Sequence, residues 1–148
     1  MIKVVIVDEA ILLSEQKHLF DTLRNLSSNR EEHRELTIKA KKSTYFVRFE
    51  DIFFIEKADR KSIIHTVDGT YQTNKSLLYY ERNLDNRFML AHRSFLINLE
   101  LVNQIEAIGQ SNIAHFRGYK LTAKISKYKL NDVEELKRKN TYKKSSYD

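Results

Sequence analysis

Two side chains with hydrogen-bonding chemistry, His92 and Arg93, stand between two apolar runs of the sequence, 88–90 and 95–97. Because short apolar runs of this kind are typical of strands, the pair is expected on a connecting loop. An arginine can bind O6 and N7 of guanine together, and a histidine can donate to N7 or to a phosphate. The competing interpretation of Arg93 is a salt bridge at the rim of the fold, with Glu100 as its partner.

A second set of cations lies in the segment 57–61, Lys-Ala-Asp-Arg-Lys, which joins two strand-like runs. We expect Arg60 and Lys61 to contact a polyanion, although an ordinary solvated turn can have the same composition. Asn98 has two open roles, because it can hydrogen-bond a phosphate or cap its own loop. The residues on their own favour the local backbone role for Asn98.

A third set, Lys124, Ser126 and Lys127, lies where the last strand-like run gives way to a predicted helix. A helix N-terminus at this junction would add backbone N–H groups for a phosphate. The sequence alone leaves open which of the two lysines would face a base.

Catalytic and metal-binding patterns are missing from the sequence. The three glycines are far apart and form no phosphate-binding loop, and no GxSxG surrounds Ser94. The five histidines include no pair at metal-site spacing, and cysteine is absent. His65 and His115 each fall in a strand-like run, where a plain position in a sheet is the simpler role. We therefore expect no enzyme, no metal and no cofactor.

The N-terminal residues 1–26 are predicted to form a strand followed by a helix. Val4–Glu9 resembles the first strand and acidic pair of a response-regulator receiver, where such a pair holds Mg²⁺ beside a phosphoacceptor aspartate. A receiver is far longer than the 43 residues available, so we expect no working phosphoacceptor site. Residues 1–43 are expected to be a strand-helix arm and linker, not a complete receiver, used for packing or dimerisation.

Residues 44–125 are predicted to form a series of short strands, because apolar and aromatic residues recur in short runs between turn residues. A further short strand is expected at 36–39. Asp68-Gly69 predicts a hairpin turn with positive φ at both residues. Gly109 and Gly118 mark later turns.

Two helices complete the predicted elements. Ser76 is expected to cap a short helix that places Leu77, Tyr80 and Leu84 on one face. A final helix is expected from about Ser126, followed by a disordered polar tail at 140–148. We find no proline and no internal repeat.

The net charge of +6 is concentrated at the C-terminus. Residues 1–43 carry 8 basic and 7 acidic side chains, residues 44–119 carry 9 and 9, and residues 120–148 carry 9 and 4, giving +1, 0 and +5. A local basic field of this kind is typical of proteins that bind polyanions, although a solvated basic tail would look the same.

Residues 44–138 resemble the LytTR DNA-binding domain of bacterial LytR/AgrA-type regulators. The strongest part is Phe88–Leu99, with an aromatic residue, His-Arg-Ser, an apolar run and Asn in the family's order. Supporting motifs are Asp51-Ile52-Phe53-Phe54-Ile55-Glu56, the Asp68-Gly69 hairpin, Lys75-Ser76-Leu77, Val102-x-x-Ile105, the Gly118 hairpin and Ile125-Ser126-Lys127.

The resemblance implies a mostly β fold, an elongated stack of small antiparallel sheets with two short helices, here with an N-terminal strand-helix extension. It implies a sequence-specific transcription regulator whose inter-strand loops enter the major grooves of double-stranded DNA. The sequence departs from the family at one point. The family commonly has Ser-Arg about six residues after the turn glycine, whereas Ser126-Lys127 comes eight residues after Gly118.

The resulting expectation is a DNA-binding domain at 44–139, with DNA contacts from His92, Arg93, Asn98, Arg60, Lys61, Lys124, Ser126 and Lys127. The expected partners are duplex DNA, a second protomer on repeated half-sites, and a regulatory protein bound through residues 1–43. No run approaches the ~20 apolar residues of a membrane span. The expected location is the bacterial cytoplasm.

Two other functions remain open from the sequence. A basic β-protein can bind RNA, but such readers stack bases on exposed aromatics, whereas Phe49, Phe53 and Phe88 are expected in the core. A signalling module acting through Asp8 and Glu9 is the other alternative.

Overall fold

The computed structural model describes the backbone of residues 4–7 and 34–145, and the side chains of 34–139. The helix expected over 12–26 and the acidic pair Asp8-Glu9 lie outside this range. The elements are β1 (Val4–Val7), β2 (Glu35–Lys39), β3 (Thr44–Arg48), η1 (Phe49–Asp51), β4 (Ile52–Ala58), β5 (Lys61–Thr66), β6 (Gly69–Thr73), α2 (Leu77–Asn83), β7 (Phe88–His92), β8 (Phe95–Asn98), η2 (Leu99–Leu101), β9 (Val102–Ile108), β10 (Ser111–Phe116), β11 (Tyr119–Ile125) and α3 (Leu130–Ser145).

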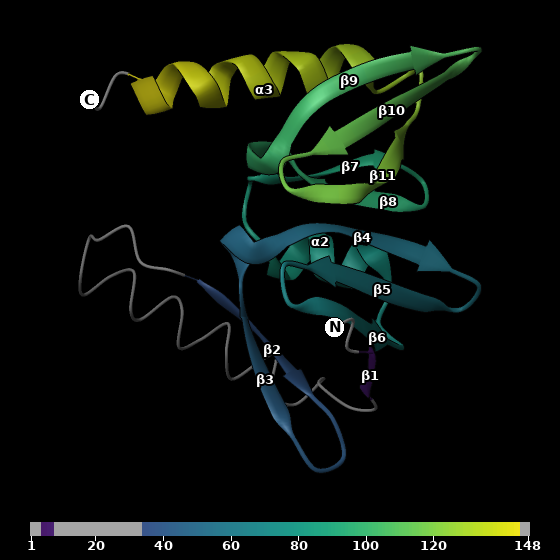
Figure 1. The fold of residues 1–148 in the computed structure, drawn as a ribbon, viewed down its shortest axis with the longest axis vertical. Helices are drawn as coiled ribbons and strands as arrows, with labels where there is room; N and C mark the ends of the chain where they lie inside the picture. The colour runs from purple at the N-terminus through teal and green to yellow at the C-terminus, as the bar shows by residue number, and fades with distance from the viewer. Residues whose placement is uncertain (1–3, 8–33, 146–148) are drawn as a thin grey trace.

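The described strands form three sheets stacked along the long axis of the molecule (Figure 1). The largest has the order β1-β6-β5-β4-β8-β7, the second the order β11-β10-β9, and β2 pairs with β3 alone. All neighbours are antiparallel except β1, which pairs with β6 in parallel. The expected mostly β, elongated stack with two helices is therefore confirmed.

Two apolar cores lie on either side of the β7–β8 hairpin. One gathers Ile55, Ile64 and Leu96 with α2, and the other gathers Phe54, Ile97 and Val133 of α3. Neighbouring residues of β8 enter different cores because successive side chains of a strand point to opposite faces. Each buried aliphatic side chain stabilises the fold by about 1.5–3 kcal/mol.

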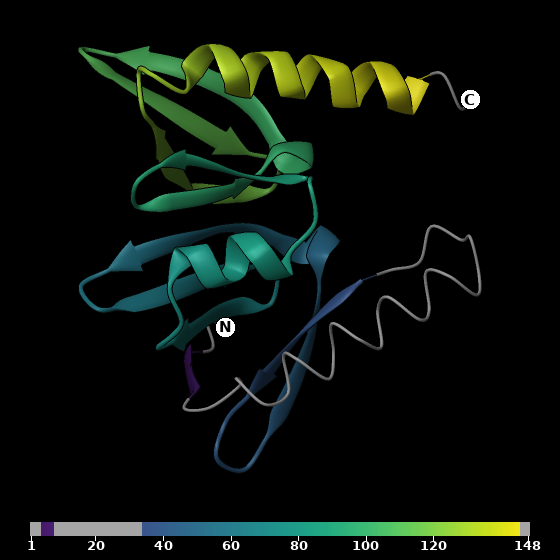
Figure 2. The same cartoon turned by 180° about the vertical axis from the view of Figure 1, so that it is seen from behind.

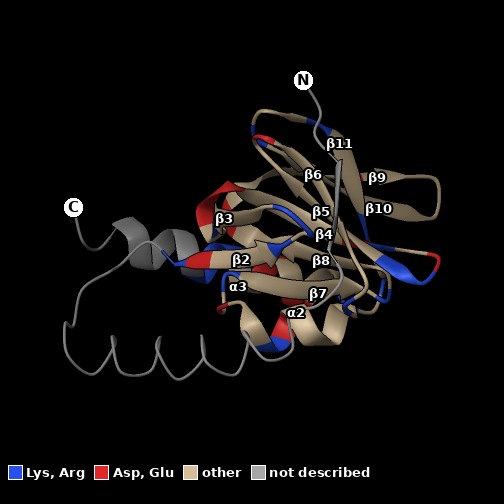
Figure 3. Cartoon of the chain, turned by 90° about the horizontal axis from the view of Figure 1, so that it is seen from below, with Lys and Arg blue, Asp and Glu red and all other residues tan. Residues whose placement is uncertain are grey.

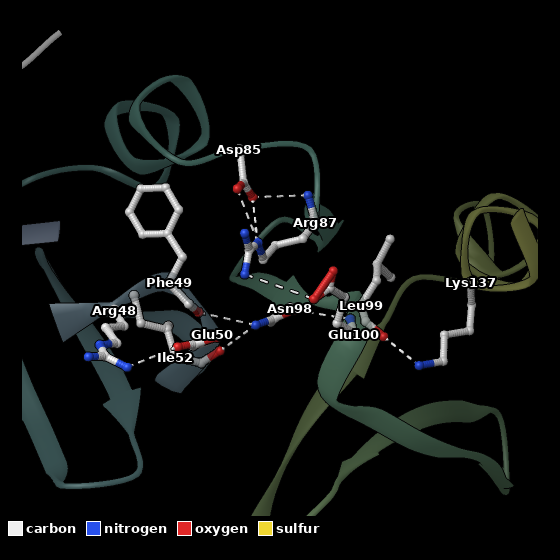
Figure 4. Close-up of polar contacts among 10 residues, drawn as sticks. All are labelled: Arg48, Phe49, Glu50, Ile52, Asp85, Arg87, Asn98, Leu99, Glu100 and Lys137. Atoms are coloured by element: carbon white, nitrogen blue, oxygen red, sulfur yellow. Dashed lines mark hydrogen bonds and ion pairs between the residues drawn. The ribbon is translucent and has the colours of Figure 1, made fainter. Parts of the chain in front are cut away.

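Asn98 joins the two halves at the buried end of β8 (Figure 4). Its side chain is fully buried, and its Nδ2 donates to the carbonyls of Phe49 (3.3 Å) and Ile52 (2.9 Å). Its Oδ1 accepts the N–H of Glu100 at 3.0 Å. One amide thus hydrogen-bonds backbone groups of η1, of the start of β4 and of η2.

Two cationic side chains, Arg87 and Lys137, hydrogen-bond or form ion pairs with residues next to Asn98 (Figure 4). The Nε of Arg87 lies 2.9 Å from Asp85, and its Nη1 lies 3.9 Å from Glu100. The Nζ of Lys137 on α3 donates to the carbonyl of Leu99 at 2.8 Å. The final helix is therefore anchored at this junction.

The structure shows a repeat that the sequence analysis missed. Residues 35–83 and 88–145 have the same order of elements: a hairpin, a 3-10 turn, a second hairpin, a third strand and a helix. The six partner pairs of β9 and β10 equal those of β4 and β5 with 50 added to every residue number, including the irregularity near one end. The Glu56–His65 contact of 2.8 Å recurs as Glu106–His115 at 2.7 Å.

The third strand of the second unit is two residues longer. Near the turn, the pair Thr66–Gly69 corresponds to Phe116–Tyr119, so 50 is added to both residue numbers. Beyond the irregularity in β11, the pair Ile64–Tyr71 corresponds to Ala114–Ala123, so 52 is added on the third strand. On this offset Lys75 corresponds to Lys127.

Most expected elements are confirmed, and three details differ. The Asp68-Gly69 hairpin turns one residue earlier, because Thr66 pairs with Gly69, and among these residues only Gly69 has positive φ. Thr66 Oγ1 holds the turn by donating to Gly69 O at 2.8 Å. The final helix begins at Leu130 because residues 127–129 form a turn, and it extends to Ser145.

We predict that Asn98→Ala strongly destabilises the protein. The substitution removes three hydrogen bonds between the buried amide and the backbone, and a buried backbone group that loses its only partner costs about 1–3 kcal/mol. Urea denaturation should show a much lower midpoint for Asn98→Ala than for Asn103→Ala, an exposed asparagine on β9. Equal midpoints for the two variants would contradict the role of Asn98.

Candidate nucleic-acid interface

Three connections lie along one edge of the molecule, on the right in Figure 1 and on the left in Figure 2. They are the β4–β5 turn, the β7–β8 turn and the β11–α3 junction. Every predicted DNA-contact residue except Asn98 lies in or beside one of them. The fold therefore brings together side chains that are more than 60 positions apart in the sequence, from Arg60 to Lys127.

The β7–β8 turn presents Arg93 at the surface. His92 pairs with Phe95 across the turn, so Arg93 and Ser94 form its tip, and Arg93 is exposed. The turn is fixed to the neighbouring strand because the N–H of Lys57 donates to Ser94 O at 2.8 Å. A guanidinium on a turn held this way can be aimed at a ligand. Glu100 contacts Arg87 at 3.9 Å, so the described contacts do not support the rim pair with Arg93.

The imidazole of His92 is held in a neutral form. Its Nδ1 accepts the N–H of Ser94 at 3.0 Å, which leaves Nε2 to carry the proton. Partial burial lowers the pKa of His92, and the positive charges of Lys124 and Arg93 lower it further. Lys124 and Arg93 therefore both act electrostatically on His92, although Lys124 comes from a different sheet.

The β4–β5 turn contributes a cluster of cations, seen in blue at the ends of these strands in Figure 3. Ala58 pairs with Lys61, so Asp59 and Arg60 form the tip, and Asp59 adopts a positive φ of 57°. Aspartate is one of the few residues other than glycine that tolerate this conformation. Arg60 and Lys57 are exposed, and Lys61 is half-buried.

An open groove of about 500 Å³ connects the β4–β5 turn with Arg93. The described residues that line it include the cations Lys57, Arg60, Lys61, Lys75 and Arg93, with Asp59 as the acidic one. Sequence reasoning did not select Lys57 and Lys75. Lys57 was visible in the basic segment 57–61, but nothing in the sequence placed Lys75 beside it.

The β11–α3 junction contains Lys124, Ser126 and Lys127. Lys124 and Lys127 are both exposed, and the N–H of Ser126 donates to Ala91 O at 2.8 Å, which fixes the junction to β7. The hydroxyl of Ser126 accepts the N–H of Tyr128 at 3.3 Å. The expected helix N-terminus is not at Ser126 but begins at Leu130, after a turn.

Asn98 does not belong to this surface. It is fully buried and its side-chain groups are used by backbone partners, so it cannot reach a phosphate. This corrects its inclusion among the DNA-contact residues and supports its local backbone role.

Within residues 34–139 and the other described positions, no group of three or more His, Cys, Asp or Glu side chains could hold a metal ion. No helix among the described residues is long and apolar enough to cross a membrane.

The sequence matches the family model of the LytTr DNA-binding domain over residues 42–138. The sensory transduction protein LytR of Staphylococcus haemolyticus is 33% identical over 89 residues, 57% of this chain and 35% of that protein. The sensory transduction protein LytT of Bacillus anthracis is 33% identical over 76 residues, 51% of this chain and 31% of that protein. The matched part thus spans about a third of these relatives.

A solved LytTr DNA-binding domain from Bacillus cereus has a similar fold, with a TM-score of 0.61 and 20% sequence identity. The match covers 71% of this chain and 97% of that structure. At this identity the likeness supports the arrangement of sheets and helices only.

We predict that the pKa of His92 lies below 6.5 and rises when Lys124 is replaced by alanine, because a repelling charge is removed. A lowered histidine pKa contributes stability that is present above about 6.5 and is lost as the pH falls through the folded-state value. Histidine NMR titration of the wild type, Lys124→Ala and Lys120→Ala measures this. A wild-type midpoint at or above 6.5, or equal midpoints in both variants, would refute the prediction.

Proposed function

Because the chain belongs to the LytTR family of DNA-binding domains, we propose that it is a sequence-specific transcription regulator that binds double-stranded DNA. The β4–β5 turn, the β7–β8 turn and the β11–α3 junction would face the duplex, with base contacts in the major groove. The observation that carries the proposal is the alignment of these three connections, with their cations, along one edge.

Roles follow from how firmly each side chain is held. Arg93 sits on a turn tied to β4, so it is assigned to a base edge, which a planar guanidinium can bind with two hydrogen bonds. His92 donates through Nε2 beside it. Arg60, Lys61 and Lys124 line the same edge, and Ser126 and Lys127 face a backbone phosphate. Phosphate contacts fix the register, whereas base contacts select the sequence.

The RNA alternative has weaker support. Phe49, Phe53 and Phe88 are 1%, 3% and 7% exposed, so these three rings are used in the cores and cannot stack on bases. Phe46 and Tyr128 are the exposed aromatics among the described residues, and they lie far apart in the sequence. The signalling alternative depends on Asp8 and Glu9, which lie outside the described residues.

We further propose that two protomers bind repeated half-sites in the bacterial cytoplasm, and that residues 1–43 form an arm that can receive a regulatory partner. The parallel pairing of β1 with β6 supports attachment of this arm to the domain. The domain proper is placed at 44–139, with the hairpin strand β2 packed onto it through Leu36 and Ile38.

The expected result of selecting bound sequences from random duplex DNA is one enriched motif, present twice at a fixed spacing. Affinity for the motif should fall with salt at a log–log slope of about −0.9 for each phosphate neutralised. The measurement is a set of binding isotherms at several salt concentrations on the motif and on a scrambled duplex. No enrichment, with equal affinity for both duplexes, would remove sequence specificity from the proposal.

Arg93→Ala should weaken binding to the selected motif by roughly 1–3 kcal/mol and change the scrambled duplex far less, because a base contact is lost. Arg117→Ala is the matched control, since Arg117 is also exposed and also lies in a two-residue hairpin turn, at the opposite edge. Equal weakening of both duplexes by Arg93→Ala would assign this arginine to the backbone instead.

A further inference from the structure

The β6–α2 junction in the first unit of the repeat corresponds to the β11–α3 junction in the second. Lys75 follows β6 as Lys127 follows β11, on the offset of 52 that the strand pairs define. Each lysine also lies near a tyrosine ring, although the two tyrosines are not at equivalent positions: Lys75 Nζ lies 5.3 Å from the ring centre of Tyr79, and Lys127 Nζ lies 5.2 Å from that of Tyr128.

The backbone of Lys75 is held in place by two side chains. The hydroxyl of the buried Ser62 donates to Lys75 O at 2.6 Å, and the N–H of Lys75 donates to Thr73 Oγ1 at 3.3 Å. Because its main chain is fixed and its side chain is half-buried, Lys75 loses less freedom on binding a ligand than a lysine on a free tail.

The charge around Lys75 suits an anion. Lys75 lines the groove together with Lys57, Arg60, Lys61 and Arg93, against the single acidic side chain of Asp59 among its described lining residues. Five cations around one open groove create a positive field that attracts phosphate groups. The groove is shared with Arg93, so an anion bound there lies beside the side chain assigned to a base edge.

We propose that the β6–α2 junction is a second phosphate-contacting site, in which the ammonium of Lys75 binds a backbone phosphate of the same duplex. This inference rests on the proposed DNA-binding function. It assigns a phosphate contact to the β6–α2 junction, which is not among the three connections named above. Each unit of the repeat then contacts a phosphate of the DNA backbone, through Lys75 in the first unit and through Lys127 in the second.

The test compares Lys75→Ala, Lys127→Ala and the double variant on the selected motif and on scrambled duplex. Each single change should lower affinity for both duplexes about eightfold near 0.1 M salt and make the salt slope shallower by about 0.9, since one phosphate contact is lost. The double variant should lose about 1.8 from the slope. Lys75→Arg keeps the charge and should retain most of the affinity.

Lys39→Ala is the control, because Lys39 is exposed on β2 and is not among the described residues that line the groove. Thermal unfolding of all variants checks that folding is preserved. If Lys75→Ala matches Lys39→Ala in affinity and slope while Lys127→Ala is impaired, the second site is wrong. NMR shifts at Lys75 caused by inorganic phosphate, without any effect of Lys75→Ala on DNA binding, would also overturn it.

The two proposals fail in different ways. If the wild type shows no sequence preference, specific recognition is refuted. A shallower log–log slope of affinity against salt for Lys75→Ala on any duplex would still support the phosphate contact. A preserved preference with an unchanged slope would refute the contact alone.

Discussion

The buried amide of Asn98 is the contact on which the arrangement of the two units depends. It lies where β8 enters η2, and it bonds the carbonyls of Phe49 and Ile52 in the first unit and the N–H of Glu100 in the second. A polar side chain with 0% exposure is tolerated only when its groups are paired, so the amide specifies one geometry of the junction. The β4–β5 turn, in the first unit, and the β7–β8 turn, in the second, are held relative to one another through that junction.

A second polar contact joins the six-stranded and the three-stranded sheets at a place away from Asn98. His65, which is buried, bonds Glu56 through Nε2 (2.8 Å) and the hydroxyl of Tyr119 through Nδ1 (2.7 Å). Tyr119 belongs to the three-stranded sheet and the other two residues to the six-stranded sheet. Burial and the charge of Glu56 raise the pKa of Tyr119, which keeps its hydroxyl protonated. The equivalent pair Glu106–His115 lies on the half-exposed side of its sheet and joins nothing further in the described contacts.

The repeat explains how a small domain places several loops on one edge. In each unit the second hairpin turn and the junction to the helix lie at the same ends of their strands, so two copies supply four such connections. The units then differ in charge. The β4–β5 tip carries Asp59 and Arg60 with lysines on both sides, whereas the equivalent β9–β10 tip is the neutral Gly109-Gln110. The two turns thus share a strand register but not their charge, and only the β4–β5 turn carries cations at and beside its tip.

The sequence by itself determined the strands, both helices, the family and most of the candidate surface, because alternating apolar residues, the Ser76 cap and the motif around His92-Arg93 are local signals. It missed the repeat because the two units share register and few residue types. It also could not decide between the two roles of Asn98, or place Lys75 beside Arg93 in one groove. Those facts depend on contacts between residues up to 49 positions apart, such as Asn98 with Phe49, which only the packed tertiary structure brings within hydrogen-bonding distance.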